Sequence, residues 1–433
     1  MPTPRKASDI LLESVETAIA AHQPAWNAYA QWAPQRVRKQ AAELIADVEK
    51  GATPGPLYGV SVSVKDNMGL NGWTMCGGGT VALPNKWQKD TALVARLRRA
   101  GALFTGLTQT VPFCFTSLGV TLEGKGPRNP HDPSRVCGGS SSGAAVSVVE
   151  GSAQLALGSD TAGSVRVPAA ICGIVGLKLG TGHWPGGGML PLSPHLDSLG
   201  IMASDMKTLA KHLHALGEPC LPTPSLSDIR LGVLESAPRV TADAGIDTAF
   251  AETLRQLETC GATLVSVDLP EATDADTLFK SGGLVAADLD AFLTRHLPEW
   301  RHQPLGMPLD AAMQRAVKVT REEYSHRLKQ RRALVQRGKT ALKRAGVDAL
   351  VLPTTPLTPP QRLCITTPEA YGLADERILR HAGFINYLDW CGISLPAGKD
   401  ALGMPVGFQL AMPAGKEHQL VALALAIESS TTD

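Results

Sequence analysis

The sequence of 433 residues has few aromatic residues, no excess of charge of either sign and no long apolar run. It holds 8 Phe, 5 Tyr and 7 Trp, and its 41 Lys and Arg balance 40 Asp and Glu. A balanced chain creates no overall field that would attract nucleic acid or an anionic membrane. No stretch reaches the roughly 18 apolar residues that a membrane-spanning helix requires. We therefore expect no nucleic-acid partner and no membrane span.

Cysteine pairs at C-x-x-C spacing are also absent, although the sequence contains eight cysteines. This excludes a zinc ribbon and a thioredoxin-type redox motif, and we expect no metal and no organic cofactor. The first 20 residues read as an amphipathic helix with acidic residues, without the apolar core of a signal peptide. We therefore expect a cytoplasmic protein with reduced thiols.

Glycine and proline, in contrast, are abundant, with 43 and 31 residues, which favours many turns. From residue 51 onwards, short β runs alternate with helical patterns, and this alternation predicts an α/β sheet covered by helices. No stretch is typical of a flexible linker, so we expect a single domain over residues 1–433. Within it, residues 1–50 are expected to form a helical N-terminal edge, and residues 225–345 a more variable, largely helical insert.

The hydrophobic patterns also predict individual elements. Leu93, Val94 and Leu97 form the apolar stripe of a helix over residues 90–100, which Asp90 can cap. Strands are expected at 231–234, 263–267 and 347–353, and two short strands near Ile393 and at 406–410. Helices are expected at 247–260 and 419–428, together with a long, basic helical region at 308–345.

The first segment that suggests chemistry is a Val-rich strand, Gly59–Asn67, with the sequence GVSVSVKDN. Side chains alternate across a strand, so Ser61, Ser63 and Lys65 share one face and the valines share the other. An edge strand with a solvated lysine would explain this pattern, and so would a lysine base buried in a site. The pattern alone leaves both interpretations open.

The second segment, Arg135–Ala145, places three serines between glycines in the sequence RVCGGSSSGAA. It contains G-x-S-x-G centred on Ser141, which is the nucleophile-elbow pattern of α/β-hydrolases. An elbow follows directly on a strand, whereas residues 128–137 (RNPHDPSRVC) are turn-forming. We therefore do not assign Ser141 as a nucleophile, and a plain flexible loop is the alternative interpretation.

The third segment, Leu157–Ala170, runs from a strand into glycine-rich backbone and then to Ser164. Small residues at 161–163 let successive backbone N–H groups approach a ligand, as an oxyanion site requires. A structural turn is the other interpretation. A nucleophilic serine also needs a proton acceptor, which could be Lys65 if burial lowers its pKa. The nearest histidines in sequence are His131, His183 and His195, and the residues alone do not decide between these acceptors.

These three segments, in this order, resemble the amidase signature family. In that family the catalytic lysine lies in a G-V-x-x-x-x-K-D strand, which matches Lys65. The bridging serine is the first serine of G-G-S-S, which falls on Ser140. The nucleophile is the serine of D-T-x-G-S-x-R-x-P-A, which falls on Ser164, and the 24-residue separation of the two serines also fits the family.

The likeness extends from about residue 55 to the C-terminus and leaves residues 265–310 unmatched. It includes CGIVGLK at 172–178, ALVLPTTP at 349–356 and GMPVGFQL at 403–410. The family's G-K-T-N-x-x-E-F motif departs, because Leu107, Gln109 and Pro112 stand in place of its Lys, Asn and Glu. These departures bear on the substrate pocket and leave the three catalytic positions intact.

The resemblance implies an α/β fold, a single compact domain with a mixed, twisted β-sheet covered on both faces by helices. It implies a serine amidohydrolase that cleaves a C–N amide bond of a small molecule through an acyl-enzyme and releases ammonia or an amine. Lys65 would be the base, Ser140 the relay after a cis peptide bond, and Ser164 the nucleophile. A homodimer is left open.

The same resemblance assigns supporting roles around Ser164. The backbone N–H groups of Thr161, Ala162 and Gly163 would form the oxyanion hole, and Asp160 and Arg166 would hold the loop in place. Two alternatives to this function stay open: the glutaminase component of a tRNA-dependent amidotransferase, which needs partner subunits, and a non-catalytic family member that binds a ligand. The serine loop also resembles that of allophanate hydrolases, but the sequence does not assign the amide.

Overall fold

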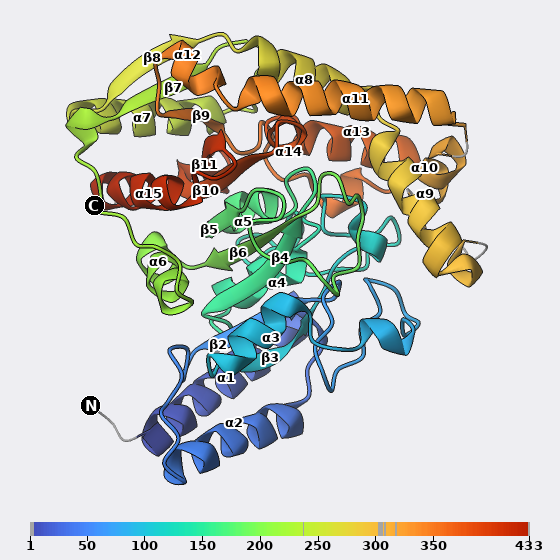
Figure 1. The fold of residues 1–433 in the computed structure, drawn as a ribbon, viewed down its shortest axis with the longest axis vertical. Helices are drawn as coiled ribbons and strands as arrows, with labels where there is room; N and C mark the ends of the chain where they lie inside the picture. Colours follow the sequence, from blue (N-terminus) through green and yellow to red (C-terminus); the bar gives the residue numbers. More distant parts are fainter. Residues whose placement is uncertain (1–3, 237, 302–305, 307–308, 317, 432–433) are drawn as a thin grey trace.

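The computed structural model describes residues 4–236, 238–301, 306, 309–316 and 318–431. Its core is an 11-stranded sheet that runs through the length of the molecule (Figure 1). The sheet is mixed, because β2 pairs in parallel with both β3 and β4, and β7 with both β8 and β9, while the other pairs are antiparallel. Across the sheet the strands are β1 (Tyr29–Gln31), β3 (Leu103–Thr108), β2 (Ser61–Lys65), β4 (Leu155–Asp160), β6 (Ser198–Ala203), β5 (Val175–Lys178), β10 (Trp390–Lys399), β11 (Pro405–Pro413), β9 (Ala349–Pro353), β7 (Arg230–Leu234) and β8 (Thr263–Val267).

Helices cover both faces of this sheet, because successive strand side chains point to opposite faces. In β4, Leu155 and Leu157 join one apolar core and Ala156 joins another. The first core is completed by α3 (Ala92–Arg99), α6 (Met206–Ala215), α7 (Ile246–Thr259) and α15 (Glu417–Thr431). The second is completed by α4 (Ser142–Val149), α5 (Arg166–Cys172) and α1 (Pro4–Trp26). The expected α/β fold with helices on both faces is confirmed.

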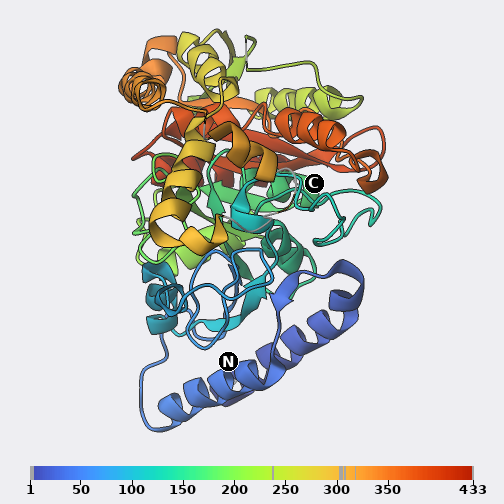
Figure 2. The ribbon, with the colours of Figure 1, turned by 90° about the vertical axis from the view of Figure 1, so that its right-hand side faces the viewer.

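The two ends of the sheet are built differently. At the N-terminal end, α1 and α2 (Pro34–Glu49) lie side by side, and the short β1 between them pairs with β3 (Figures 1 and 2). At the other end, residues 225–345 add β7 and β8 to the sheet. The same segment supplies α8 (Pro270–Lys280), α9 (Leu284–His296), α10 (Leu309–Ala316), α11 (Arg321–Gly338) and α12 (Ala341–Ala345). Two further helices, α13 (Pro368–Ile378) and α14 (Gly383–Tyr387), follow β9.

Two details of the sequence-based prediction were wrong. The N-cap of α3 is Thr91, whose Oγ1 accepts a hydrogen bond from the Val94 N–H, while Asp90 instead pairs with Arg98. The strands expected to be short, β10 and β11, span 10 and 9 residues and pair with each other along most of their length. β1 was not predicted, because three residues are too few for a hydrophobic alternation to show. None of the helices in the described ranges is long and apolar enough to cross a membrane.

Candidate active site

Lys65 is the last residue of β2, and its side chain is fully buried. The strand register places it beside the end of β4, which runs parallel to β2, so the carboxyl ends of two neighbouring strands meet here. The Lys65 Nζ donates to the Oγ of Ser140 at 2.8 Å and to the Oγ of Ser159 at 3.0 Å. The lysine therefore faces serine hydroxyls, and the interpretation as a solvated surface lysine is wrong.

Burial dominates the electrostatics of this lysine. Removal from water lowers the pKa of Lys65, and the nearby Cys114, Asp160 and Asp197 offset only part of that effect. Asp66 is not a close partner, because its carboxylate accepts the N–H groups of Cys76 and Gly78, each at 3.0 Å. Burial without a closely paired carboxylate therefore disfavours the charged form of Lys65.

Ser140 follows a cis peptide bond, Gly139–Ser140, as the family resemblance predicted. Its side chain is fully buried against Lys65. The next residue, Ser141, donates its hydroxyl to the Ser159 carbonyl at 3.2 Å and its N–H to the Ser164 carbonyl at 3.1 Å. Ser141 thus ties the serine loop to the β4 segment, and it is not a lining residue of the cavity in front of Ser164.

Ser164 lies in the turn between β4 and α5, and a buried ion pair holds this turn. Asp160 and Arg166 are both fully buried, with 2.9 Å between Asp160 Oδ1 and Arg166 Nη2. The same carboxylate accepts the N–H groups of Gly163 at 2.8 Å and Val165 at 3.1 Å. Burial alone would raise the pKa of Asp160, but the charge of Arg166 and its hydrogen bonds hold that pKa below its ordinary value. The expected structural role of this pair is confirmed.

The backbone donors in the turn are not equivalent. The Gly163 N–H is occupied by Asp160, whereas the N–H groups of Thr161 and Ala162 have no acceptor among the described residues. Thr161 is positioned by its side chain, whose Oγ1 donates to Asp197 at 2.6 Å. Of the three donors predicted for an oxyanion hole, two are therefore free in this structure and the third is engaged.

A cavity of about 600 Å³ opens in front of Ser164. It is lined by Thr161 and Ala162, by the thiol-bearing Cys114, and by Arg327 of α11. The Nη1 of Arg327 is buried and has no hydrogen-bond acceptor among the described residues. The described hydrogen bonds include none between the hydroxyls of Ser164 and Ser140.

The histidines considered from the sequence do not reach this cavity. His131 contacts the Cys172 carbonyl at 2.9 Å, and His183 lies between two glutamates in a different cavity. His195 is not among the lining residues of the Ser164 cavity either. None of these three histidines is therefore placed beside Ser164.

The three departures from the family motif have separate places. Leu107 is buried in the apolar core of β3. Gln109 and Pro112 line a second cavity of about 510 Å³, together with Phe113 and Trp300, which pack edge to face. This second cavity shares Phe115 and Thr116 with the Ser164 cavity. Two of the three departures therefore shape the space next to the site, as the sequence suggested.

Comparison with known proteins agrees with this geometry. The Amidase family model matches residues 10–421. The chain belongs to the amidase signature family. Its members hydrolyse carbon–nitrogen bonds, and this protein is such an enzyme.

Two curated relatives of this amidase span nearly its whole length. The 2-amino-5-chloromuconic acid deaminase of Comamonas testosteroni is 39% identical over 428 residues, covering 97% of this chain and 92% of that protein. A glutamyl-tRNA(Gln) amidotransferase subunit of Symbiobacterium thermophilum is 31% identical over 469 residues, covering 97% and 93%. Among solved structures, a crystal structure of an amidase has a TM-score of 0.83 at 28% identity, covering 100% and 97%.

Sequence reasoning missed several residues of the amidase site. Ser159 accepts a hydrogen bond from Lys65, as Ser140 does, and nothing in its sequence context distinguishes it from an ordinary strand serine. Cys114 and Arg327 line the cavity but lie outside the three motifs. Arg327 was overlooked because its helix is basic along its length, so no single arginine stands out.

Proposed function

We propose that this amidase is a serine amidohydrolase with a Ser-Ser-Lys triad, in which Ser164 is the nucleophile, Ser140 the relay and Lys65 the base. The observation that carries the proposal is the buried hydrogen bond of 2.8 Å between Lys65 Nζ and Ser140 Oγ. The position of Ser164 also supports the proposal. Ser164 lines the neighbouring cavity and lies in the turn that the Asp160–Arg166 pair holds.

The proposed reaction proceeds in two halves. Neutral Lys65 takes a proton from Ser140, which takes the proton of Ser164, while the Ser164 Oγ forms a bond to the substrate carbonyl carbon. The C–N bond then breaks, and the leaving nitrogen receives the proton back along the same path. Water then attacks the acyl-enzyme and gives a proton to the relay of Ser140 and Lys65. The acid is released, and the Ser164 Oγ regains its proton from the same relay.

The developing oxyanion would be stabilised by the N–H groups of Thr161 and Ala162, which have no acceptor of their own among the described residues. Gly163 would join them once its N–H turns away from Asp160, to which it now donates. Thr161 and Ala162 are therefore the donors best prepared for this role, and Gly163 is a conditional third.

Arg327 supports a carboxylate-bearing substrate class. Arg327 lines the same cavity as Ser164, and its Nη1 has no acceptor among the described residues, which supports a carboxylate on the substrate. Gly283, at the same cavity, leaves room for it, since a Cβ there would collide with the Arg327 Nη1. The 39% identical relative is named for the deamination of an acid, 2-amino-5-chloromuconic acid, which agrees with a carboxylate-bearing substrate.

A second candidate function is the glutaminase component of an amidotransferase, which the 31% identical relative favours. It would require partner subunits to use the ammonia. Glutamine hydrolysis by the isolated chain, enhanced by such partners, would distinguish it from an independent amidohydrolase.

The test is an ammonia-release screen on the purified chain alone. The panel pairs each amide or enamine with and without a carboxylate, and it includes urea derivatives and glutamine. We expect release from small carboxylate-bearing compounds, with loss of activity in Ser164→Ala. Ammonia release that persists unchanged in Ser164→Ala would contradict the triad, and a preference for uncharged substrates would contradict the carboxylate class.

A further inference from the structure

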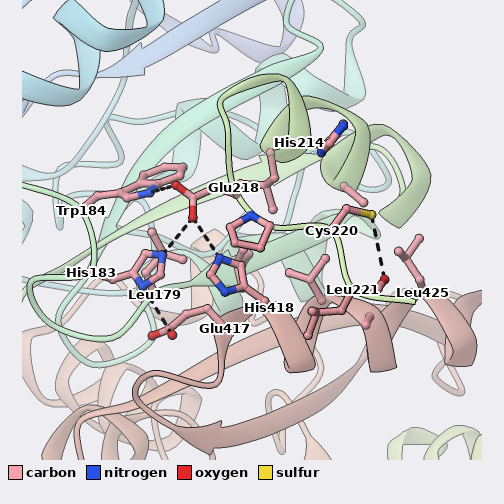
Figure 3. A pocket seen from close by; sticks show the side chains of 16 residues that line it. Leu179, His183, Trp184, His214, Glu218, Cys220, Leu221, Glu417, His418 and Leu425 are labelled. Carbon is pink, nitrogen blue, oxygen red and sulfur yellow. Dashed lines mark hydrogen bonds and ion pairs between the residues drawn. The ribbon is translucent and has the colours of Figure 1, made fainter. Parts of the chain in front are cut away.

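A second cluster of polar side chains lies where three segments distant in sequence meet (Figure 3). His183 follows β5, Glu218 follows α6, and His418 is in the first turn of α15. The Nε2 atoms of His183 and His418 lie 3.4 and 3.0 Å from the same oxygen, Glu218 Oε2. One ligand atom from each of the three residues lies within 4.8 Å of the other two.

Without an ion, the two histidines contact Glu218 directly, at hydrogen-bond distances, and the same spacing is compatible with a metal ion. Zinc bonds to histidine nitrogen and carboxylate oxygen are about 2.0–2.2 Å long, which in a tetrahedral site puts neighbouring ligands about 3.3–3.5 Å apart. The two separations from Glu218 Oε2, 3.4 and 3.0 Å, lie at or just inside that edge length. Small movements of the side chains would therefore complete the geometry.

Neighbouring groups orient the three side chains toward one another. The other ring nitrogen of His183, Nδ1, lies 3.4 Å from Glu417 Oε2, within ion-pair distance of a second carboxylate. The second oxygen of Glu218 is held by Trp184 Nε1 at 2.7 Å and by Arg96 at 3.2 Å. These contacts occupy the outward atoms and leave Glu218 Oε2 and the two Nε2 atoms facing each other.

The space beside the cluster is small and mostly apolar in its wall. The cavity at this cluster has a volume of about 30 Å³, which holds an ion with a water but no organic molecule. Apolar side chains complete its wall: Leu179, Leu213, Val421 and Leu425. None of the residues that line this cavity lines the Ser164 cavity.

We propose that His183, Glu218 and His418 bind a divalent transition-metal ion, of which zinc fits the ligand set best, with water as a fourth ligand. Two imidazoles and one carboxylate form a ligand set that zinc uses in proteins. The ion would join the segment after β5 to the ends of α6 and α15. Its role is to stabilise the fold, and amide hydrolysis at Ser164 proceeds without it.

The test measures zinc binding by the full-length protein after treatment with a chelator and desalting. Isothermal titration calorimetry with ZnCl2 should show one ion per chain, and thermal unfolding should occur at a higher temperature with zinc. His418→Ala should lose this binding and the thermal shift. The matched control is His214→Ala, because His214 lines the same cavity but lies outside the cluster, and it should bind as the unsubstituted protein does.

Further measurements test whether a folding defect, rather than the loss of a ligand, explains the loss of zinc binding. Circular dichroism and amide hydrolysis should be unchanged in His418→Ala without zinc, and Co²⁺ should give the intense visible spectrum of a tetrahedral site only in proteins with an intact cluster. Equal zinc affinity in His418→Ala and the unsubstituted protein would overturn the proposal, and so would the absence of saturable binding in the unsubstituted protein. Neither outcome bears on the proposed triad, whose tests do not involve zinc.

Discussion

The Nζ of Lys65 and the Oγ of Ser140 lie 2.8 Å apart, and both side chains are fully buried. The two residues are 75 positions apart in sequence and meet because β2 ends beside the loop that precedes α4. The nearby Cys114, Asp160 and Asp197 stabilise the charge of this lysine only in part, so burial still lowers its pKa. The proposed transfer of a proton from Ser140 to Lys65 depends on this contact, which the fold creates.

The first prediction concerns pH. Burial lowers the pKa of Lys65 below that of an ordinary lysine, and only the neutral amine can accept a proton. The rate should therefore be low where Lys65 is protonated and rise with pH through a single ionisation below the ordinary lysine range. The measurement is kcat/KM against pH. A profile that follows a histidine, near about pH 6.5, would contradict the assignment.

The second prediction separates two serines. Ser164→Ala should lower kcat on the order of 10⁶-fold, as removal of a serine nucleophile does in a comparable triad. Ser141→Ala should retain most of the activity, because the Ser141 hydroxyl only donates to the Ser159 carbonyl. Steady-state kinetics of the two variants check this, and an inactive Ser141→Ala beside an active Ser164→Ala would reverse the assignment.

The third prediction concerns substrate selection. Arg327→Gln should raise KM for carboxylate-bearing substrates roughly 10- to 100-fold, since a charge-assisted hydrogen bond contributes about 1.5–3 kcal/mol. The expected change in kcat is small. Arg332→Gln is the matched control, because Arg332 is an exposed arginine on the same helix. Equal KM values for Arg327→Gln and the unsubstituted enzyme would show that Arg327 does not bind the substrate.

The fourth prediction concerns stability. Asp160→Asn leaves the buried Arg166 without its countercharge, and breaking a buried pair costs about 3–5 kcal/mol. The free energy of unfolding, measured in urea at neutral pH, should fall by that amount. The double variant Asp160→Asn with Arg166→Met should recover part of the loss, because no unpaired charge is then buried. Unchanged unfolding of Asp160→Asn would mean that the pair does not hold the turn.

The pH dependence of this contribution has a definite sign. The pKa of Asp160 is held below its ordinary value in the folded protein, so its contribution is fully present above the pKa of an unfolded aspartate, about 3.9. The contribution is lost as the pH falls below that value toward the folded pKa. The difference in unfolding free energy between Asp160→Asn and the unsubstituted protein should therefore shrink in acid.

The fold class could be predicted from local patterns, whereas the three candidate catalytic positions were assigned through the resemblance of three short motifs to the amidase signature family. The valine alternation around Lys65 and the glycine and hydroxyl residues around Ser140 and Ser164 are visible within short segments. The hydrogen bond between Lys65 and Ser159 depends on the pairing of β2 with β4, two segments distant in sequence. No single segment encodes that pairing. The same holds for the cluster of His183, Glu218 and His418, whose members come from three separate elements.

The most direct test of the proposed mechanism is the kcat/KM of Lys65→Arg. Arginine keeps the positive charge and much of the length of lysine, but its guanidinium stays protonated in any accessible buffer and cannot act as a base. We expect no amide hydrolysis above the background rate in a folded Lys65→Arg protein, at any pH between roughly 6 and 10. Turnover at the rate of the unsubstituted enzyme would show that Lys65 is not the base and would contradict the proposed mechanism.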